Sequence, residues 1–527
     1  MFIDEQLIGI IEAKAYEKSV YAIIDNQCHE YAKNVKDEDV HYCMGKWQSY
    51  KVPFVFATNG RPYLKQIETE SGIWFQDLRK EINIPLALQG WYSPEDLLAK
   101  FKQNVDEADQ KLENLPYDFL RDPDGLNFRY YQLEAVEAVE KAVIHGQTRI
   151  LLAMATGTGK TRTILGMIYR FLKTNRFRRI LFLVDRTAIG EQAQDVFNDV
   201  KLEDLQPLNK IYNINTLDDI NLASETRIQV ATVQGMIARI MSDDKERIPS
   251  SGDFDCIIID EAHRGYTLDR ELSEAELLYR DQNDFVSKYK KVIEYFDAVK
   301  IGLTATPALH TTQIFGNAVY TYSYREAVID GYLVDYDAPH IIKTELNQHG
   351  IHHNKGESLA KYNPVTKELL NPEELEDEVN FDVEEFNKNV LTPSFNKVVL
   401  NELSKYIDPE SEEKVVIFAV NDRHADEIVK QLRDIYSEQD VPSAAIEKIT
   451  CAIGDRDRVQ DAIKRFKNEH FPTIAVTVDL LSTGIDVPEI TKIVFMRRIK
   501  SRILYEQMLG RATRLCPKIN KTHFDIF

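Results

Sequence analysis

Long apolar runs, closely spaced cysteines and a leader-like start are all missing from this sequence. No apolar run is long enough to span a bilayer, which argues against a membrane protein. The first residues, MFIDEQLIGIIEAK, have neither a basic start nor a small-residue cleavage site, so we expect no signal peptide. The five cysteines are scattered without metal-ligand spacing, which favours a reduced, cytoplasmic setting.

The charge balance is strongly acidic. Formal net charge is −20 over 527 residues, although the apolar and charged fractions are ordinary for a globular protein. A negative surface weighs mildly against nucleic-acid binding, because phosphates need local Lys and Arg. Net charge describes the whole surface, however, so a local basic groove remains compatible with it.

Two stretches of the chain alternate short apolar runs with helix-forming segments, and this alternation predicts parallel sheets covered on both faces. In the first set, helices are expected at Tyr131–His145 and Lys160–Lys173. Expected strands are Arg149–Ala153, Ile180–Val184, Ile228–Thr232, Cys256–Ile259 and Lys300–Leu303, followed in the second set by Lys414–Ala419, Thr473–Val478 and Lys492–Phe495. The pattern predicts two similar α/β domains that face each other across a cleft.

Breaker-rich and polar segments divide the chain into four expected regions: 1–115, 116–345, 346–395 and 396–527. In the first region we expect a turn at Asp4-Glu5-Gln6, strands at Leu7–Glu12 and Val52–Ala57, and helical sequence from Ser93 to Asn114. The third region is polar and acidic and is interpreted as a linker or insertion.

A glycine-rich segment between an expected strand and an expected helix has the pattern of a phosphate-binding loop. It runs Met154-Ala155-Thr156-Gly157-Thr158-Gly159-Lys160-Thr161, with Met154 where the strict pattern has glycine. Its backbone N–H groups and the helix N-terminus would hold phosphate oxygens. Lys160 would reach the outer phosphates and Thr161 would hold Mg²⁺. The alternative is a glycine-rich turn with a chance lysine.

An acidic pair follows the apolar strand that ends at Ile259. Asp260 is placed to hold Mg²⁺, and Glu261 to orient and deprotonate an attacking water. The alternative is a solvated acidic turn. Thr304 and Thr306, at the end of the next strand, could link the γ-phosphate to the neighbouring domain, although threonine-rich turns are common.

Paired arginines occur late in the second set. On a helix predicted over Ile503–Thr513, with Gly510 inside it, Gln507, Arg511 and Arg514 would share one face and could bind a polyanion. Upstream, Gly484 and Asp486 lie on an expected loop that could approach a nucleotide. The alternatives are a surface helix with salt bridges and an ordinary turn.

Taken in order, these blocks resemble superfamily 2 helicases and translocases of the DEAH-box type, and more closely the R subunit of type I restriction enzymes. The matching segments are RYYQLEAV (129–136), LLAMATGTGKTRT (151–163), FRRILFLVDRTAIGEQA (177–193), IIIDEAHRGY (257–266), GLTATPA (302–308), YSYREAVIDGYLVDY (322–336) and SRILYEQMLGRATRL (501–515). The resemblance implies two tandem RecA-like domains, with ATP and Mg²⁺ as cofactors. It also implies that Gln132 contacts adenine, His263 couples hydrolysis to domain movement and Arg514 is the arginine finger.

The N-terminal region resembles part of a PD-(D/E)xK nuclease. Glu12 and Lys14 match its ExK half, where the carboxylate holds Mg²⁺ and the lysine orients water, and Gln27 and Tyr31 match an accessory motif. The partner aspartate would precede Met1, so the nuclease site is expected to be incomplete. The helical region with which R subunits join their complex would follow Phe527, and we therefore expect a chain shortened at both ends.

The predicted fold is α/β, with a partial nuclease-like domain (1–115), a RecA-like domain with the ATP site (116–345), a linker (346–395) and a second RecA-like domain (396–527). The predicted function is an ATP-dependent translocase on double-stranded DNA and restriction subunit, cytoplasmic, with modification and specificity subunits as partners and no membrane. The alternatives are a stand-alone superfamily 2 helicase on DNA or RNA, and a non-cleaving fragment of the restriction complex.

Overall fold

The computed structural model divides the chain into two compact units, with the main boundary between Ser323 and Tyr324 and with Thr156–Thr158 grouped with the second unit. Among the described residues, no helix is both long and apolar enough to cross a bilayer. The described residues are 1–80, 84–184, 202, 206–215, 225–244, 247–263, 290–307, 309–344, 348–354, 357–363, 368–374, 379–381, 387, 392–437, 439–454, 456–478, 487–499 and 501–527.

A parallel sheet forms the centre of the first unit. Its described strands pair in the order β13-β7-β12-β11-β8-β10-β9, and each pair is parallel. The strands are β7 (Arg149–Met154), β8 (Ile180–Val184), β9 (Asn213–Asn215), β10 (Thr226–Thr232), β11 (Cys256–Ile259), β12 (Val299–Thr304) and β13 (Ala318–Tyr322). The five predicted strands of this set are confirmed to within two residues at each end.

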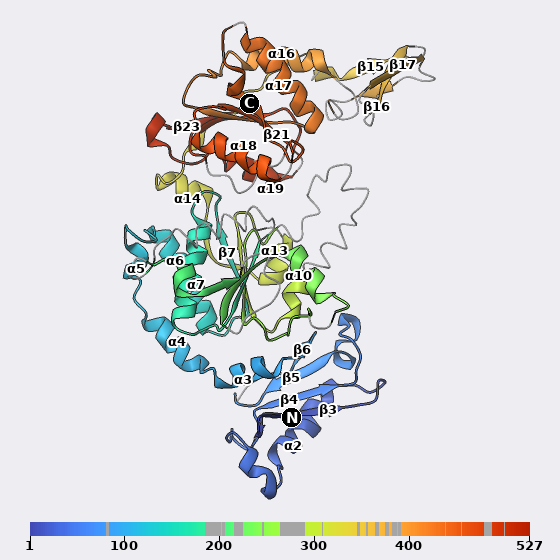
Figure 1. The fold of residues 1–527 in the computed structure, drawn as a ribbon, viewed down its shortest axis with the longest axis vertical. Helices are drawn as coiled ribbons and strands as arrows, with labels where there is room; N and C mark the ends of the chain where they lie inside the picture. The colour runs from blue at the N-terminus through green and yellow to red at the C-terminus, as the bar shows by residue number, and fades with distance from the viewer. Residues whose placement is uncertain are drawn as a thin grey trace. The chain divides into compact units, whose positions relative to one another are not determined.

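Helices cover both faces of this sheet, as a parallel sheet requires. α6 (Tyr130–Ile144) and α7 (Lys160–Lys173) lie on one side, and α10 (Val233–Ile240) and α13 (Leu309–Phe315) on the other (Figure 1). Met236 of α10 and Phe315 of α13 are buried in one core cluster with alternate residues of the strands, such as Ile257 and Ile259.

A buried ion pair fixes α7, the helix that begins at the glycine-rich loop, against α6. Arg170 Nε donates to Glu140 Oε1 at 2.6 Å and its NH2 group donates to Oε2 at 3.0 Å, with both side chains almost wholly buried. The other guanidinium hydrogens bond the backbone oxygens of Leu115 and Pro116. Such a pair is stable only when its remaining donors are satisfied, as they are here, so it orients α7.

The second unit also contains a parallel sheet, with described strands in the order β14-β23-β22-β19-β21-β20. Two separate core clusters line its two faces. The strands are β14 (Asp335–Tyr336), β19 (Lys414–Phe418), β20 (Ile446–Lys448), β21 (Ile474–Thr477), β22 (Ile490–Phe495) and β23 (His523–Ile526). The helices include α16 (Pro393–Leu403), α17 (Asp422–Ser437), α18 (Arg456–Asn468) and α19 (Arg502–Leu509). The second alternating set is therefore a second α/β domain.

The predicted helix over Ile503–Thr513 is too long. α19 ends at Leu509 and Gly510 is its C-cap. Glycine inside a helix is costly in backbone entropy, which favours ending the helix there. Arg511 lies in a turn, and Arg514 forms an antiparallel bridge with Leu333. The prediction that Gln507 and both arginines share one helical face is therefore wrong.

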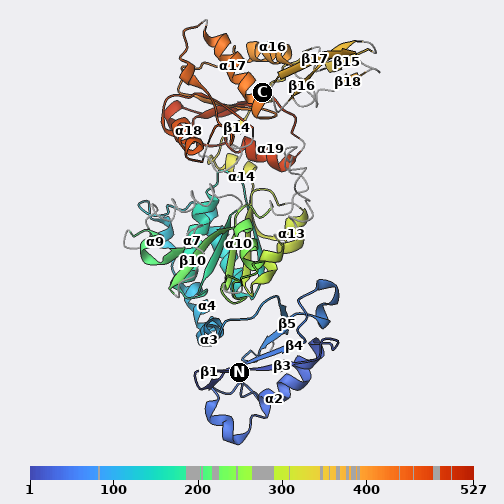
Figure 2. The ribbon, with the colours of Figure 1, turned by 45° about the vertical axis from the view of Figure 1, so that its right-hand side comes forward.

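The N-terminal part of the first unit contains a mixed four-stranded sheet. β3 (Gly9–Ala13) pairs parallel with β4 (Phe54–Thr58), and β5 (Ile73–Asp77) and β6 (Leu86–Leu88) follow antiparallel (Figure 2). β1 (Phe2–Ile3) and β2 (Gln6–Leu7) form a hairpin around Asp4, so the expected turn is confirmed. The strand predicted over Leu7–Glu12 is confirmed as β3 to within two residues at each end, although Leu7 itself belongs to β2 and Ile8 lies between the two strands.

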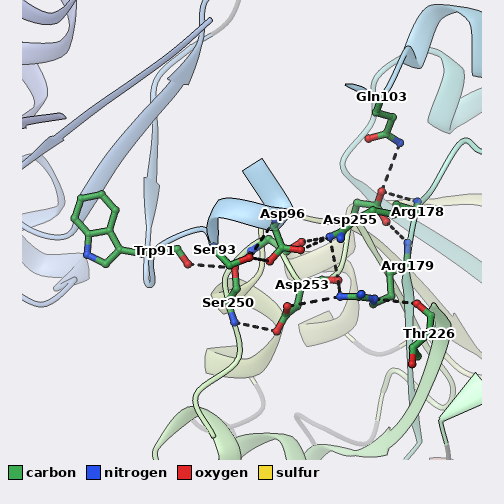
Figure 3. Close-up of polar contacts among 11 residues, drawn as sticks. Trp91, Ser93, Asp96, Gln103, Arg178, Arg179, Thr226, Ser250, Asp253 and Asp255 are labelled. Carbon is green, nitrogen blue, oxygen red and sulfur yellow. Dashed lines mark hydrogen bonds and ion pairs between the residues drawn. The ribbon is translucent and has the colours of Figure 1, made fainter. Parts of the chain in front are cut away.

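The helical sequence predicted from Ser93 to Asn114 forms two helices, α3 (Pro94–Lys102) and α4 (Val105–Asn114). α3 joins the four-stranded sheet to the seven-stranded one through a network of polar contacts (Figure 3). Asp96 Oδ1 pairs with Arg178 NH2 at 2.7 Å, and Ser93 N donates to Ser250 Oγ at 2.9 Å. Burial, with the Asp96 carboxylate nearby, raises the pKa of Asp253 in this network to about 7.

The polar segment expected to be a linker contains strands that the sequence did not suggest. Its described residues form two antiparallel pairs, β15 (Ile351–His353) with β18 (Val379–Phe381) and β16 (Ser358–Asn363) with β17 (Glu368–Glu374). Two of these strands are only three residues long and none of the four shows a regular apolar alternation, which is why pattern alone did not mark them.

Candidate functional site

The glycine-rich loop has the backbone conformation that phosphate binding needs. It leaves β7 at Met154 and enters α7 at Lys160. Gly157 and Gly159 have φ of +88° and +82°, a region that favours glycine. A Cβ on Gly159 would lie 2.8 Å from Gln132 Nε2, so the close approach also requires glycine. The predicted strand–loop–helix setting is confirmed.

Gln132 lies against this loop. Its Nε2 donates to Gly159 O and to Thr163 Oγ1, both at 3.3 Å, and its Oε1 accepts from Arg129 N at 3.0 Å. The side chain is 4% exposed, and it caps the start of α6. To contact adenine, the Gln132 side-chain amide would have to exchange one of these hydrogen bonds for a bond to the base. Adenine binding by Gln132 therefore stays a prediction.

The acidic pair lies at the same sheet edge as the loop. β12 pairs with both β7 and β11, so the carboxyl ends of all three parallel strands meet there. Lys160 Nζ is 3.6 Å from Glu261 Oε1, and the two side chains are 9% and 14% exposed. Glu261 has φ of +49°, which is uncommon for a non-glycine residue and occurs where the surrounding structure holds the backbone in place.

His263 connects the acidic strand end to the neighbouring strand. Its Nδ1 lies 2.8 Å from Thr304 Oγ1 and 3.4 Å from Glu261 Oε2, and the ring is buried. Thr304 Oγ1 also accepts from Thr306 N at 3.1 Å. The sequence marked both threonines but missed that Thr304 bonds His263, because the partner strand is forty residues away in sequence and adjacent only in the sheet.

Asp260 and Thr161 have the donor groups that a magnesium ion takes. Asp260 is 8% exposed at the end of β11, and its Oδ1 accepts from Glu261 N at 2.9 Å. Thr161 follows Lys160 in the first turn of α7. A carboxylate and a hydroxyl are hard oxygen ligands, which Mg²⁺ prefers when it also binds phosphate. The residues present therefore fit Mg²⁺–ATP.

The predicted residues of the second unit occupy the end of α19 and the turn after it. Gln507 is buried on α19, Arg511 lies in the turn and Arg514 pairs with Leu333. Val334 N donates to Thr513 O at 2.8 Å, which fixes this segment further. Gly484 and Asp486 lie outside the described residues.

Glu12 and Lys14 lie at the end of β3, which is the last described strand on one side of its sheet. The Lys14 ammonium bonds the Glu12 carboxylate, and this bond raises the pKa of Lys14, with a smaller contribution from Tyr31. The structure therefore brings Glu12 and Lys14, both predicted nuclease residues, into direct contact. The described residues contain one cluster of three or more candidate metal ligands, and Glu12 is not in it.

Family models match three parts of the chain. Residues 1–101 match the second domain of the type I restriction enzyme EcoKI endonuclease subunit, and residues 125–309 match the type III restriction enzyme res subunit. Residues 398–516 match the helicase conserved C-terminal domain.

Similar proteins include two endonuclease subunits from Escherichia coli. The EcoKI subunit of strain K12 is 44% identical over the whole chain, which spans 46% of that protein. The EcoAI subunit is 28% identical over 98% of the chain and 58% of its own length. A solved fragment described as an HsdR subunit from Vibrio vulnificus YJ016 is 22% identical, with a TM-score of 0.50 over 98% of this chain and 80% of that fragment. The chain thus spans about half the length of the curated relatives it matches.

Proposed function

The chain belongs to the family of type I restriction enzyme endonuclease subunits, with helicase-type RecA-like domains, and on that premise we propose that it hydrolyses ATP to translocate on duplex DNA. The observation that carries this proposal is the phosphate loop itself. Two glycines with positive φ lead into Lys160, whose ammonium lies 3.6 Å from Glu261 at the carboxyl edge of a parallel sheet.

The proposed chemistry assigns each residue of this edge one task. The loop amides and Lys160 bind the phosphates. To reach the phosphates, the Lys160 ammonium moves away from the Glu261 carboxylate. Glu261 then orients the attacking water and accepts its proton. Mg²⁺, when bound, neutralises charge on the phosphate oxygens, and Thr161 with Asp260 would hold it.

The second unit contributes proposed residues of its own. Arg514 is the proposed arginine finger, and Arg511 and Gln507 are proposed to act on the nucleotide as well, because guanidinium groups stabilise charge that develops during phosphoryl transfer. Gly484 and Asp486 are proposed to approach the nucleotide. The role of the phosphate loop and the role of these arginines are separate predictions. Both are to be tested in one nucleotide-bound state.

The partners are also proposals. Double-stranded DNA is the proposed substrate for translocation. The proposed partner subunits are the modification and specificity subunits of a type I restriction complex, and the proposed location is the cytoplasm. The similarity to the EcoKI and EcoAI endonuclease subunits supports this assembly.

ATP turnover by the purified chain should rise when long linear duplex DNA is added. The reason is that a translocase couples ATP hydrolysis to movement along duplex DNA. Turnover would be measured by phosphate release at low salt, because backbone contacts weaken as salt rises. Equal or greater stimulation by RNA or forked DNA, with strand displacement, would favour a stand-alone helicase and contradict the duplex translocase.

We expect no metal-dependent DNA cleavage by this chain. Lys14 already engages Glu12, and Glu12 belongs to no cluster of three candidate metal ligands among the described residues. The assay is incubation of supercoiled plasmid with Mg²⁺ or Mn²⁺. Cutting that is lost in Lys14→Ala but kept in the matched surface variant Lys33→Ala would show that a working nuclease site exists.

A further inference from the structure

A group of histidine and aspartate side chains with no role in the proposed ATP site lies at one edge of the sheet in the second unit. Asp337, His523 and Asp525 each offer one ligand atom, and these atoms all lie within 4.8 Å of one another. His523 Nε2 is 3.8 Å from Asp337 Oδ2. That spacing is close to the separation of two ligand atoms around one tetrahedral ion, since metal–ligand distances near 2.1 Å place neighbouring ligands about 3.4 Å apart.

The topology explains why these residues meet. His523 and Asp525 alternate along β23 and so share one face of the sheet. β14 pairs parallel with β23, and Asp335 lies opposite His523. After β14 the chain continues along β23, where Asp337 N donates to Phe524 O at 3.3 Å. Asp337 therefore reaches the same face from a segment far away in sequence.

A second observation points to a metal at this place. Thr522 Oγ1 lies 2.9 Å from His523 Nδ1, where it can accept the Nδ1–H. When Nδ1 carries the proton and donates it to this hydroxyl, Nε2 carries the lone pair, and Nε2 is the atom that faces Asp337. Metal-binding histidines almost always hold their other ring nitrogen in this way.

A fourth side chain is near. His340 Nε2 is 3.8 Å from Asp525 Oδ1, and the His340 ring stacks on Phe527 with centroids 4.7 Å apart. Two carboxylates with neutral imidazoles match the charge of a divalent ion. The neighbouring Lys492, opposite Asp525 on β22, has its ammonium bonded to Glu413 Oε2 at 2.6 Å.

From this geometry we propose a Zn²⁺ site formed by Asp337, His523 and Asp525, with His340 poised to complete it. Mixed nitrogen and oxygen ligands favour zinc, whereas Mg²⁺ and Ca²⁺ take oxygen alone. The ion would tie the segment after β14 to β23, and so fix the edge of the six-stranded sheet. Nothing in this site depends on nucleotide or DNA.

The test is Zn²⁺ binding to chelator-treated protein without nucleotide, followed by competition with a chromogenic zinc chelator. The wild-type chain should bind one Zn²⁺ and gain thermal stability from it, and Mg²⁺ should not compete. His523→Ala and Asp525→Asn should lose this binding. Thr522→Val should bind about tenfold more weakly, because outer contacts of a ligand typically contribute that much.

Two control variants distinguish Zn²⁺ binding at the proposed site from binding elsewhere and from loss of folding. His145→Ala removes an exposed histidine from the other unit and should bind Zn²⁺ as the wild type does. Asp337 is 70% exposed, so Asp337→Asn should fold normally, which circular dichroism would check, and should still weaken binding. No Zn²⁺ binding by the wild type, or binding that these ligand substitutions leave unchanged, would overturn the proposal.

Discussion

Lys160→Ala is expected to abolish ATP hydrolysis. Lys160 is the first residue of α7, and its ammonium lies at the sheet edge 3.6 Å from Glu261 Oε1. Alanine keeps the helix but removes the cation that would contact the outer phosphates. Losing one preorganised charge at the position where charge develops typically lowers the rate by about 10²–10³-fold, and here it should also weaken nucleotide binding.

The matched control for this variant is Lys173→Ala at the other end of the same helix. Lys173 is exposed and lies over the rings of Phe119 and Tyr169 rather than near the loop. Phosphate release should stay close to the wild-type rate in this control. Wild-type-like hydrolysis in Lys160→Ala would remove Lys160 from the phosphate site, and with it the proposed motor activity.

Glu261→Gln should stop turnover without abolishing nucleotide binding. Glutamine has the shape of glutamate and can keep the backbone at φ of +49°, but it cannot accept a proton from water. General-base catalysis typically contributes about 10²–10⁴-fold, so the rate should fall by that order. Binding of a fluorescent ATP analogue and single-turnover hydrolysis would separate the two steps.

The control for the second variant is Glu137→Gln. Glu137 lies on α6 and pairs with Lys141 one turn later, in an exposed i,i+4 ion pair. Its loss should change neither binding nor hydrolysis. If Glu261→Gln hydrolysed ATP at the wild-type rate, a different residue would have to activate the water.

Local patterns predicted the helix that follows the phosphate loop and two strands of the same sheet. β8, α7 and β11 begin and end at the predicted residues, because continuous apolar runs bounded by breakers leave few alternatives. Glycine spacing indicated the phosphate-binding loop, and the structure shows that Gly157 and Gly159 have positive φ, a backbone conformation that few other residues adopt at low cost. The family resemblance, based on the same motifs, was confirmed by the relatives.

Short or polar elements were not predicted. β14, β20 and β23 are two to four residues long, too short for a periodicity to be visible. The end of α19 was placed four residues too late, because its periodicity continued while Gly510 ended the helix. The proposed zinc ligands were not noticed at all, since Asp337 lies far from His523 and Asp525 along the chain.

The sequence by itself determined which residues have the chemistry for phosphate binding, water activation and charge stabilisation, because residue type and local spacing fix those capacities. Only the tertiary structure decided which of them meet. β12 stands between β7 and β11, and this strand order brings Lys160, Glu261 and the His263–Thr304 pair to one edge. Strand order depends on long-range packing of buried faces, which local sequence does not encode.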